Sequence, residues 1–412
     1  MGGSVFLTGP NRRDFDLPGV KLRIAQGAGP LASDIRIPTF HGDAFISSQA
    51  RALLENLTAS RGDAAERRTL GSKAIEAWLE RFVSRALSVA TNKLRDAARV
   101  VAKPLRLEEE FTQLDGMIGA LLGTRKVRLS ASAAIARAAG KPYDAARVTL
   151  FQVLAAELQR DPLQVPPGDP QADVHLQAFI ESYFSNFIEG TEFELEEAHD
   201  IVVSGRPLKY REDDSHDILG TYQAILQSKV HSTIPQKFED FANQLQRWNR
   251  QVIESRQSKN PGEFKAEPNR AGNTIFVAPD LVVGTLGKGY EIIMSATTPE
   301  NRAALAMFVV SEVHPFADGN GRTARLATNQ FLTQAGLARI VIPTVFRDDY
   351  ITALKALSVN SLPMPLGRMM ARAARFSRWL EMSSKASAFA ALKKSHALER
   401  AEAAQLTFDQ NL

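Results

Sequence analysis

The sequence predicts a mainly α-helical protein, with a helical N-terminal region followed by a second helical domain that contains one small β-hairpin. Three observations support this fold class. Apolar residues recur at helical spacing, as in Ile75, Trp78, Leu79 and Phe82. A proline-rich stretch at residues 161–170 interrupts the helical pattern. Segments typical of strands are short and few, so we expect little sheet.

The N-terminal region is expected to cover residues 1–165 and to be largely helical. Residues 1–45 are rich in Gly, Pro and Asp, which predicts an irregular leader with one strand near Lys21–Ile24. Helices are expected from Ser47 to Arg160. The stretch Asp161–Pro170 cannot lie inside a helix, because proline fixes φ and lacks an N–H. We therefore expect the domain boundary there.

The second domain is expected at residues 170–385, with a first helix at about 173–190. Between Gly262 and Tyr290 the composition changes to Gly, Asn, Pro and Val, which predicts a hairpin at about 272–284. Its two strands would be Thr274–Val277 and Leu281–Val283. Helices return from Pro299, and residues 386–412 are expected to form a helical tail.

Composition excludes several classes of function. The 412 residues include no cysteine, so a disulfide framework, a Cys-ligated zinc site and a thiol nucleophile are excluded. The 50 Lys and Arg against 46 Asp and Glu are too balanced to demand nucleic acid or a membrane surface as partner. Residues 129–158 weakly suggest a helix-turn-helix, but plain helix packing is the commoner cause, so nucleic acid is not an expected partner. The longest apolar run, Ala303–Val310, is far short of the ~20 residues of a membrane span, and no secretory signal is present, so we expect a cytoplasmic protein without a membrane partner.

One segment carries chemistry: His314-Pro-Phe-Ala-Asp318-Gly-Asn-Gly-Arg322-Thr-Ala-Arg325. It joins two amphipathic helices, so its glycines form a tight turn at a helix N-terminus. Gly319 and Gly321 lack Cβ atoms, which allows successive backbone N–H groups to converge on an anion. The helix dipole adds positive potential at the same place.

The polar side chains of this segment suit a nucleotide triphosphate. Arg322 and Arg325 are three residues apart, so both are expected on one helix face, where their guanidinium groups would bind phosphate oxygens. Asp318 offers an oxygen ligand for Mg²⁺, and His314 can take up a proton near neutral pH. A base, a metal ligand, an anion site and two arginines together indicate phosphoryl or nucleotidyl transfer.

The segment resembles the motif of the Fic family, His-Pro-Phe-x-Asp/Glu-Gly-Asn-Gly-Arg-x-x-Arg, at every fixed position. Fic proteins are mainly helical and transfer AMP from ATP to a protein hydroxyl with release of pyrophosphate. The resemblance implies that His314 deprotonates a Ser, Thr or Tyr of the target and that Asp318 holds Mg²⁺. It implies that Arg322 steadies the phosphates and that Arg325 reaches the γ-phosphate. It also makes Gly319, Asn320 and Gly321 the anion hole.

The family resemblance extends to two further elements. Fic proteins have a hairpin flap that aligns the backbone of the target as an added strand, and residues Thr274, Ile275, Phe276 and Val277 are in the right place for it. Tyr350 resembles a position that walls the nucleotide. An asparagine expected seven or eight residues later is replaced here by Leu357-Ser358.

A second motif predicts regulation. Some Fic proteins carry an inhibitory helix N-terminal to the motif, with the pattern Ser/Thr-x-x-x-Glu-Gly/Asn, and this chain has Ser185-Asn-Phe-Ile-Glu189-Gly190. Glu189 falls at the negative end of a helix dipole, so it needs a cation. Ser185 can hydrogen-bond it, and Arg325 is the expected ion partner. The resulting prediction is an autoinhibited adenylyltransferase; simple exposure of Glu189 is the alternative.

Two rival functions remain open from the sequence. One is transfer of another group, such as UMP or phosphate; the other is a catalytically silent adaptor that binds nucleotide. The expected partners are ATP and an unidentified target protein. The resemblance also makes automodification and a homodimer candidate properties.

Overall fold

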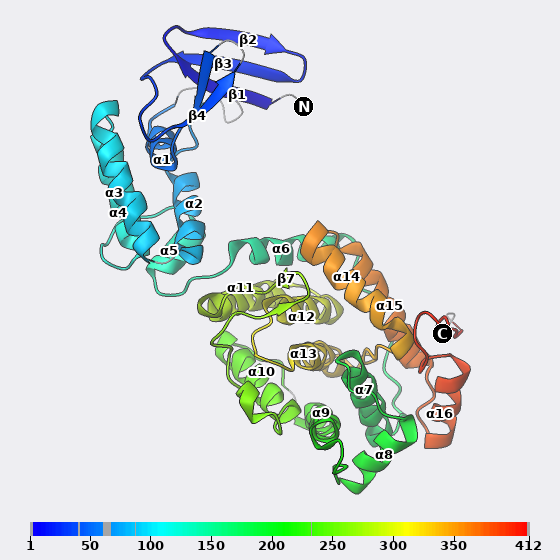
Figure 1. Cartoon of the computed structure of the whole chain (residues 1–412). Helices are drawn as coiled ribbons and strands as arrows, with labels where there is room; N and C mark the ends of the chain where they lie inside the picture. Colours follow the sequence, from blue (N-terminus) through cyan, green and yellow to red (C-terminus); the bar gives the residue numbers. More distant parts are fainter. Residues whose placement is uncertain (1–2, 40–41, 61–66, 87, 232, 410–412) are drawn as a thin grey trace. The chain divides into compact units, whose positions relative to one another are not determined.

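The computed structural model describes residues 3–39, 42–60, 67–86, 88–231 and 233–409. The chain divides into two compact units, unit 1 (Met1–Pro142) and unit 2 (Tyr143–Leu412). The prediction of a mainly α-helical protein is confirmed, since helices make up most of unit 2 and cover more of unit 1 than strands do (Figure 1). None of the helices within the described part of the chain has the length and apolar composition needed to cross a bilayer.

Unit 1 begins with strands that the sequence analysis did not anticipate. A three-stranded sheet has the order β1-β3-β2, with β1 parallel and β2 antiparallel to β3, and a hairpin pairs β4 with β5. The strands are β1 (Gly3–Gly9), β2 (Arg13–Leu17), β3 (Val20–Gln26), β4 (Ile35–Thr39) and β5 (Gly42–Ile46). The expected irregular leader with one strand is therefore wrong. The missed signal was period-two alternation, as in Val20, Leu22 and Ile24, which the many Gly, Pro and Asp residues obscured.

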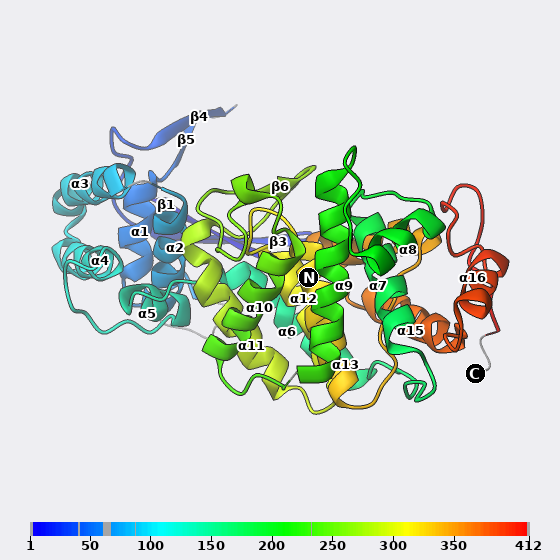
Figure 2. The ribbon, with the colours of Figure 1, turned by 90° about the horizontal axis from the view of Figure 1, so that it is seen from below.

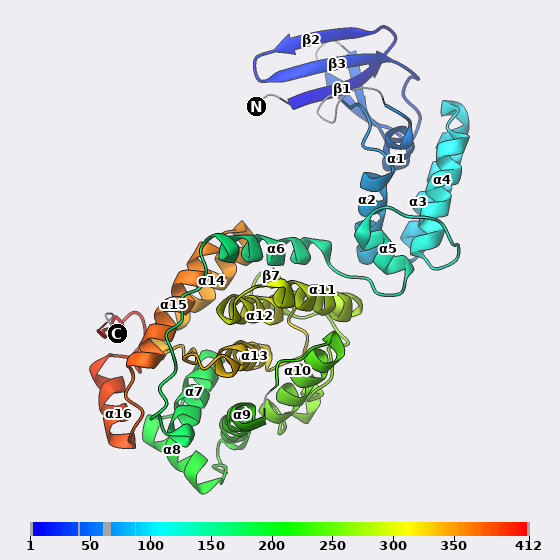
Figure 3. The same ribbon diagram turned by 180° about the vertical axis from the view of Figure 1, so that it is seen from behind.

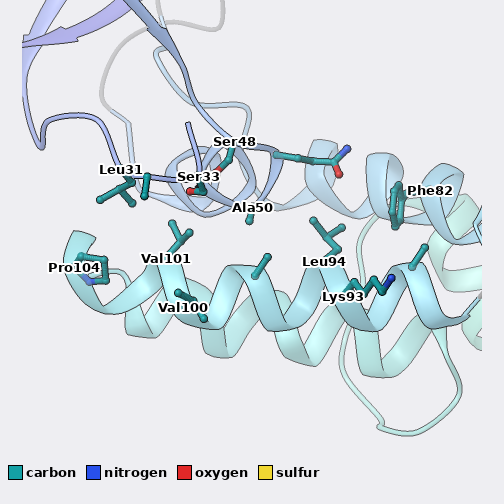
Figure 4. A pocket seen from close by; sticks show the side chains of 14 residues that line it. Leu31, Ser33, Ser48, Ala50, Phe82, Lys93, Leu94, Val100, Val101 and Pro104 are labelled. Carbon is teal, nitrogen blue, oxygen red and sulfur yellow. Dashed lines mark hydrogen bonds between the residues drawn. The ribbon is translucent and has the colours of Figure 1, made fainter. Parts of the chain in front are cut away.

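The rest of unit 1 is helical, as predicted. Its helices are α1 (Gln49–Leu57), α2 (Ser72–Arg85), α3 (Ser88–Leu105), α4 (Glu108–Leu121) and α5 (Ser132–Ala138). They enclose a core that includes Leu54, Leu79 and Ile118. An apolar groove of about 710 Å³ runs between α1 and α3, where Leu94 and Val101 point toward α1 (Figure 4). Lys93 alone is charged among the described residues that line it, so the groove has no evident chemistry.

Unit 2 is built around two buried helices, α12 and α13. Helix α12 packs against α6 and α11, whereas α13 packs against α7, α9 and α10 (Figures 1 and 3). In the view of Figure 2, α9 and α10 lie in front of α12 and α13. The run Ala303–Val310 is completely buried in α12, which explains the longest apolar stretch of the sequence. The helices are α6 (Ala145–Arg160), α7 (Val174–Ile188), α8 (Leu195–Ser204), α9 (Glu212–His231), α10 (Phe238–Val252), α11 (Val282–Ser295), α12 (Pro299–Val313), α13 (Asn320–Gln334), α14 (Arg347–Asn360), α15 (Met364–Trp379) and α16 (Lys385–Lys394).

The boundary between the units lies before α6, not in the proline-rich stretch where the sequence placed it. Phe151 of α6 packs edge to face against Phe308 of α12, with ring centroids 6.0 Å apart. The proline-rich stretch itself is bound to unit 2, because the Gly168 N–H donates to the Gly336 carbonyl at 2.9 Å. The prolines end a helix without ending a domain. The predicted helical tail is also shorter than expected, because α16 ends at Lys394 and turns and extended chain follow to residue 409.

The hairpin of unit 2 is shifted relative to the prediction. Strand β6 (Arg270–Ala271) pairs antiparallel with β7 (Thr274–Ile275), and we call this hairpin and residues 276–277 the flap. Residues 281–283, predicted as the second strand, instead enter a helix. Pro279 opens a 3₁₀ turn at residues 279–281, and α11 follows with its apolar side chains toward the core at helical spacing.

Candidate active site

A cavity of about 340 Å³ in unit 2 gathers residues from elements far apart in the sequence. His314 follows the end of α12, and Gly321 and Arg325 lie on the first turns of α13. Glu189 follows α7, and Tyr350 lies on α14. The flap forms a further wall. The cavity therefore brings together the predicted base, one predicted phosphate-binding arginine and the predicted inhibitory glutamate.

The imidazole of His314 is held on two sides. The residue has the left-handed backbone conformation (φ 52°) and caps α12, and its Nδ1 lies 3.2 Å from the Ser311 carbonyl oxygen. The ring of Phe276, from the flap, stacks on it at a centroid distance of 3.7 Å and an interplanar angle of 5°. Burial lowers the pKa of His314 to about 4, so the ring is neutral at pH 7.

The tautomer of this neutral ring follows from its neighbour. A carbonyl oxygen can only accept, so the bond to Ser311 requires the proton on Nδ1 and leaves the lone pair on Nε2. His314 therefore has one nitrogen able to accept a proton.

The glycine turn after His314 is braced by two asparagines. The Asn320 side chain accepts from the Phe316 N–H at 2.8 Å and donates to the Phe316 carbonyl at 2.9 Å. The Asn249 amide donates to the Asp318 carbonyl at 2.8 Å. Gly319 has φ 74° and would bring a Cβ to 2.9 Å from the Asn249 amide nitrogen, so only glycine fits there.

Helix α13 begins directly after this turn, with Gly319 as its N-cap residue. The first backbone N–H groups of a helix have no partner inside the helix. Those of Asn320 and Gly321 are thus available, together with the positive end of the helix dipole, for an anion. The anion site at Gly319, Asn320 and Gly321 stays a prediction, and α13 begins at the place that it requires. The Asn320 side chain serves the turn rather than the anion.

Arg325 is bound to α7 by three contacts. Its Nε donates to the Ser185 hydroxyl at 2.9 Å, and its Nη2 donates to the Ser185 carbonyl at 2.8 Å. Nη2 also lies 2.7 Å from Glu189 Oε1. The expected ion pair is present, but the expected bond from Ser185 to Glu189 is replaced by one from Arg325 to Ser185. Nη1 of Arg325 is buried and has no hydrogen-bond partner within the described part of the chain.

Glu189 is the counterion on the cavity side. Its side chain is 30% exposed, whereas that of Arg325 is 4% exposed. Burial alone would raise the pKa of Glu189, but Arg325 and then Arg322 outweigh that effect, so the pKa is lowered and the carboxylate is charged at pH 7. Gly190 follows with φ 96°, a conformation that suits glycine at a helix end.

Arg322 differs from the prediction, because its guanidinium does not line the cavity. Its Nη1 lies 2.7 Å from Asp217 Oδ2 and donates to Asn186 Oδ1 at 3.1 Å. Asp217 lies on α9 and also binds Arg256 at 2.9 Å. The two arginines of the motif thus have separate partners, and Arg322 points to a buried network. Sequence reasoning missed Asp217 and Asn186, and nothing in their local sequence signals the contact.

Asp318 is 36% exposed at its side chain and accepts the Gly319 N–H through Oδ1 at 2.6 Å. Over the residues that the structure describes, no group of three or more His, Asp or Glu side chains could hold a metal ion by itself.

The remaining predicted residues are divided among the cavity, the surface and the core. Thr274 and Phe276 line the cavity, Ile275 points outward and is 67% exposed, and Val277 is buried in the core. Tyr350 lines the cavity, with its ring centroid 5.9 Å from the Arg325 guanidinium carbon. Several lining residues were not predicted from the sequence. They include Glu312, Arg347, Lys355 and Ser358.

Residues 238–332 match the family model described as the Fic/DOC family, which includes the flap and the whole segment from His314 to Arg325. These residues are therefore similar to the Fic/DOC family. Glu189 and Tyr350 lie outside the matched residues.

Similar proteins carry the same family name. A protein adenylyltransferase Fic from Drosophila willistoni is 31% identical over 185 residues, which cover 43% of this chain and 36% of the relative. A protein adenylyltransferase from Caenorhabditis briggsae is 26% identical over 199 residues, which cover 47% of this chain and 39% of the relative. This chain thus spans less than two fifths of the length of these curated relatives.

Solved structures give the same family name. A structure of residues 134–508 of Fic-1 from Caenorhabditis elegans has a TM-score of 0.42 and 20% identity, and the match covers 78% of this chain and 94% of that one. A Fic domain protein from Bacteroides thetaiotaomicron has a TM-score of 0.42 and 19% identity, and the match covers 60% and 97% of the two chains.

Proposed function

We propose that this chain transfers AMP from ATP to a Ser, Thr or Tyr hydroxyl of a target protein, and that Glu189 restrains this activity. One observation carries the proposal. A neutral imidazole whose Nε2 can accept a proton, a helix N-terminus whose first N–H groups have no partner within the helix, and an arginine meet at one cavity. The names of the similar proteins support adenylyl transfer.

The chemistry follows from these positions. The target hydroxyl loses its proton to Nε2 of His314, and its oxygen attacks the α-phosphorus of ATP. A new P–O bond forms as the bond to the β-phosphate oxygen breaks, and pyrophosphate leaves with the electron pair. The N–H groups at the start of α13 would stabilise the charge on the phosphates. Arg325 would bind the γ-phosphate through its unpartnered Nη1 and through the donors that Glu189 now occupies.

Asp318 fits the role of a Mg²⁺ ligand. Mg²⁺ commonly takes one or two carboxylates, and phosphate oxygens and water complete its shell. The single, partly exposed carboxylate of Asp318 beside the anion site meets that need. When bound, the ion would neutralise phosphate charge.

The restraint rests on the contact between Glu189 and Arg325. A carboxylate 2.7 Å from the guanidinium competes with the γ-phosphate for the same donors. ATP would then lie displaced from the pose that in-line attack requires, and an error of about 1 Å can cost ~100-fold in rate. We expect Arg322 to act differently, as a buried cation that fixes α13 to α7 and α9.

The test is transfer of label from ATP to proteins of a cell lysate. Glu189→Gly is expected to raise incorporation from [α-³²P]ATP by about 10- to 100-fold over the parent. His314→Ala in the Glu189→Gly background should lower it at least ~100-fold. Glu192→Gly is the control, since Glu192 lies three residues away on the surface and pairs with Arg400.

The outcomes separate the parts of the proposal. Equal labelling by the parent and Glu189→Gly would contradict the restraint. Incorporation of label from [γ-³²P]ATP would indicate that phosphate is transferred. The mass added to the modified protein would reveal transfer of UMP. No labelling by Glu189→Gly with ATP or UTP would favour a silent nucleotide-binding adaptor.

A further inference from the structure

The flap is a very small hairpin, so its position must be fixed by contacts outside it. Each strand has two residues, and two residues form the turn between them. Isolated two-stranded hairpins are at best marginally stable in water. One contact is the stack of Phe276 on His314. A second contact comes from α6.

The pairing shows which backbone groups of the flap point outward. The Phe276 N–H donates to the Asn269 carbonyl at 3.3 Å, and Ala271 closes the turn opposite Thr274. In an antiparallel ladder bonded pairs alternate with non-bonded pairs, so the pair between them, Arg270 and Ile275, is non-bonded. The carbonyl of Ile275 therefore points away from β6.

Arg147 of α6 binds this outward carbonyl. Its Nη2 donates to the Ile275 oxygen at 2.6 Å. Its Nη1 donates to Oε1 of Glu312, which also accepts from the Ser358 hydroxyl at 3.0 Å. Glu312 is 4% exposed and lies two residues before His314 on α12. A single guanidinium fork thus connects the flap to the helix that carries the base.

We propose that Arg147 is a positioning residue that anchors the flap over the active site, with Glu312 as its buried counterion. The proposal rests on the proposed function, since it assigns the flap the alignment of the target. Two arguments carry it. The buried Glu312 needs a cation, which keeps Arg147 in place. Arg147 binds the carboxylate and the Ile275 carbonyl through two separate nitrogen atoms of one planar fork, an arrangement that the single Nζ of a lysine does not reproduce.

The bond from Arg147 to the Ile275 carbonyl also has an opposite interpretation, and the test must distinguish the two. Because the Ile275 carbonyl lies on the free edge of β7, Arg147 could compete with an incoming target strand. The brevity of the hairpin favours an anchor. Loss of an anchor would loosen the flap and lower transfer, whereas loss of a competitor would raise transfer.

The test is Arg147→Lys, measured by amide hydrogen exchange of the full chain. Lysine keeps a charge for Glu312 but has one nitrogen atom in place of the two that Arg147 uses, so we expect it to lose the bond to Ile275. We expect residues 274–277 to exchange about tenfold faster, with exchange in α13 unchanged. Arg160→Lys is the control, because Arg160 lies on the same helix, is 76% exposed at its side chain and pairs with Glu157. Unchanged exchange in the flap would overturn the proposal.

A second variant and a second readout complete the design. Should Arg147→Lys fail to fold, Glu312→Gln keeps the shape of the counterion, weakens its hold on Arg147 and should also speed flap exchange. In the Glu189→Gly background, Arg147→Lys should lower AMP transfer to lysate proteins several-fold while the Kd of a fluorescent ATP analogue stays the same. Increased transfer would overturn the anchor. Hydrogen exchange needs no transferase activity, so failure of the proposed function would be seen separately.

Discussion

Arg322 and Arg325 lie one turn apart on α13, yet they serve different purposes. Both side chains are almost completely buried. The partner of Arg322 is Asp217, which is 1% exposed and is shared with Arg256. The partner of Arg325 is Glu189, which is 30% exposed on the wall of the cavity. A fully buried ion pair, such as that of Arg322 with Asp217, is costly to separate. An ion pair whose carboxylate is partly exposed to solvent, such as that of Arg325 with Glu189, can exchange the carboxylate for another anion. The comparison indicates that Arg325 is the arginine open to ligand.

The largest effect expected from this comparison is on stability. Asp217→Asn would leave two guanidinium groups without their buried counterion, at a cost of about 3–5 kcal/mol in the free energy of unfolding. Glu189→Gln removes a pair that is partly screened by solvent, so we expect a loss of about 1 kcal/mol or less. Urea unfolding of the two variants, followed by circular dichroism, gives both values. Equal losses would refute the distinction between the two arginines.

The sequence could predict this site as far as its geometry is local. His314, Gly319 and Arg325 belong to one helix–turn–helix segment, so their spacing fixes their relative positions. Glu189 could be linked to Arg325 through a second motif and the resemblance to the Fic family. The sequence could not link Asp217 to Arg322. Their contact depends on how α9 packs against α13, which lies more than a hundred residues later in the chain.

The errors in predicting the fold from the sequence have a similar origin. A short apolar run such as Leu281–Val283 is compatible with a strand or with the start of a helix, and only the packing of α11 decides between them. The prolines of residues 161–170 correctly predict an interruption of the helices. They do not predict a domain boundary, since α6 packs on α12 across that interruption.

A glycine makes the contact of Glu189 with α13 possible, and this gives a second prediction. A Cβ on Gly321 would lie 2.1 Å from Glu189 Oε1. Gly321→Ala should therefore displace the carboxylate and cost about 1–3 kcal/mol in the parent. In the Glu189→Gly background only Arg325 Nη1, at 3.1 Å, stays close to this Cβ. Since that guanidinium can then move, alanine should be neutral or stabilising by up to about 1 kcal/mol.

The measurement is a double-mutant cycle on thermal unfolding, with Gly321→Ala, Glu189→Gly and the double variant. Additive changes would mean that the carboxylate does not occupy the space beside Gly321. The cycle therefore tests the position of Glu189 independently of any activity.

The smallest expected effect is on the pKa of His314, the proposed base. It again distinguishes the carboxylate of Glu189 from that of Asp217. Burial holds the pKa of His314 near 4, while the negative charge of Glu189 raises it toward the ordinary histidine value. Glu189→Gln should therefore lower the pKa of His314 further, whereas Asp217→Asn should leave it unchanged, because Asp217 does not act on this ring. NMR titration of the imidazole, assigned by its absence in His314→Ala, measures both shifts.

The same titration has a consequence for stability whose sign is fixed. Unfolded histidine titrates near 6.5, above the folded value of about 4, so the unfolded chain binds more protons between these values. The contribution of His314 to stability is thus fully present above pH 6.5 and is lost as the pH falls toward 4. Replacing His314 should flatten this part of the pH dependence. If His314 instead titrates near 6.5, the ring is not buried, and the stack of Phe276 on it is contradicted.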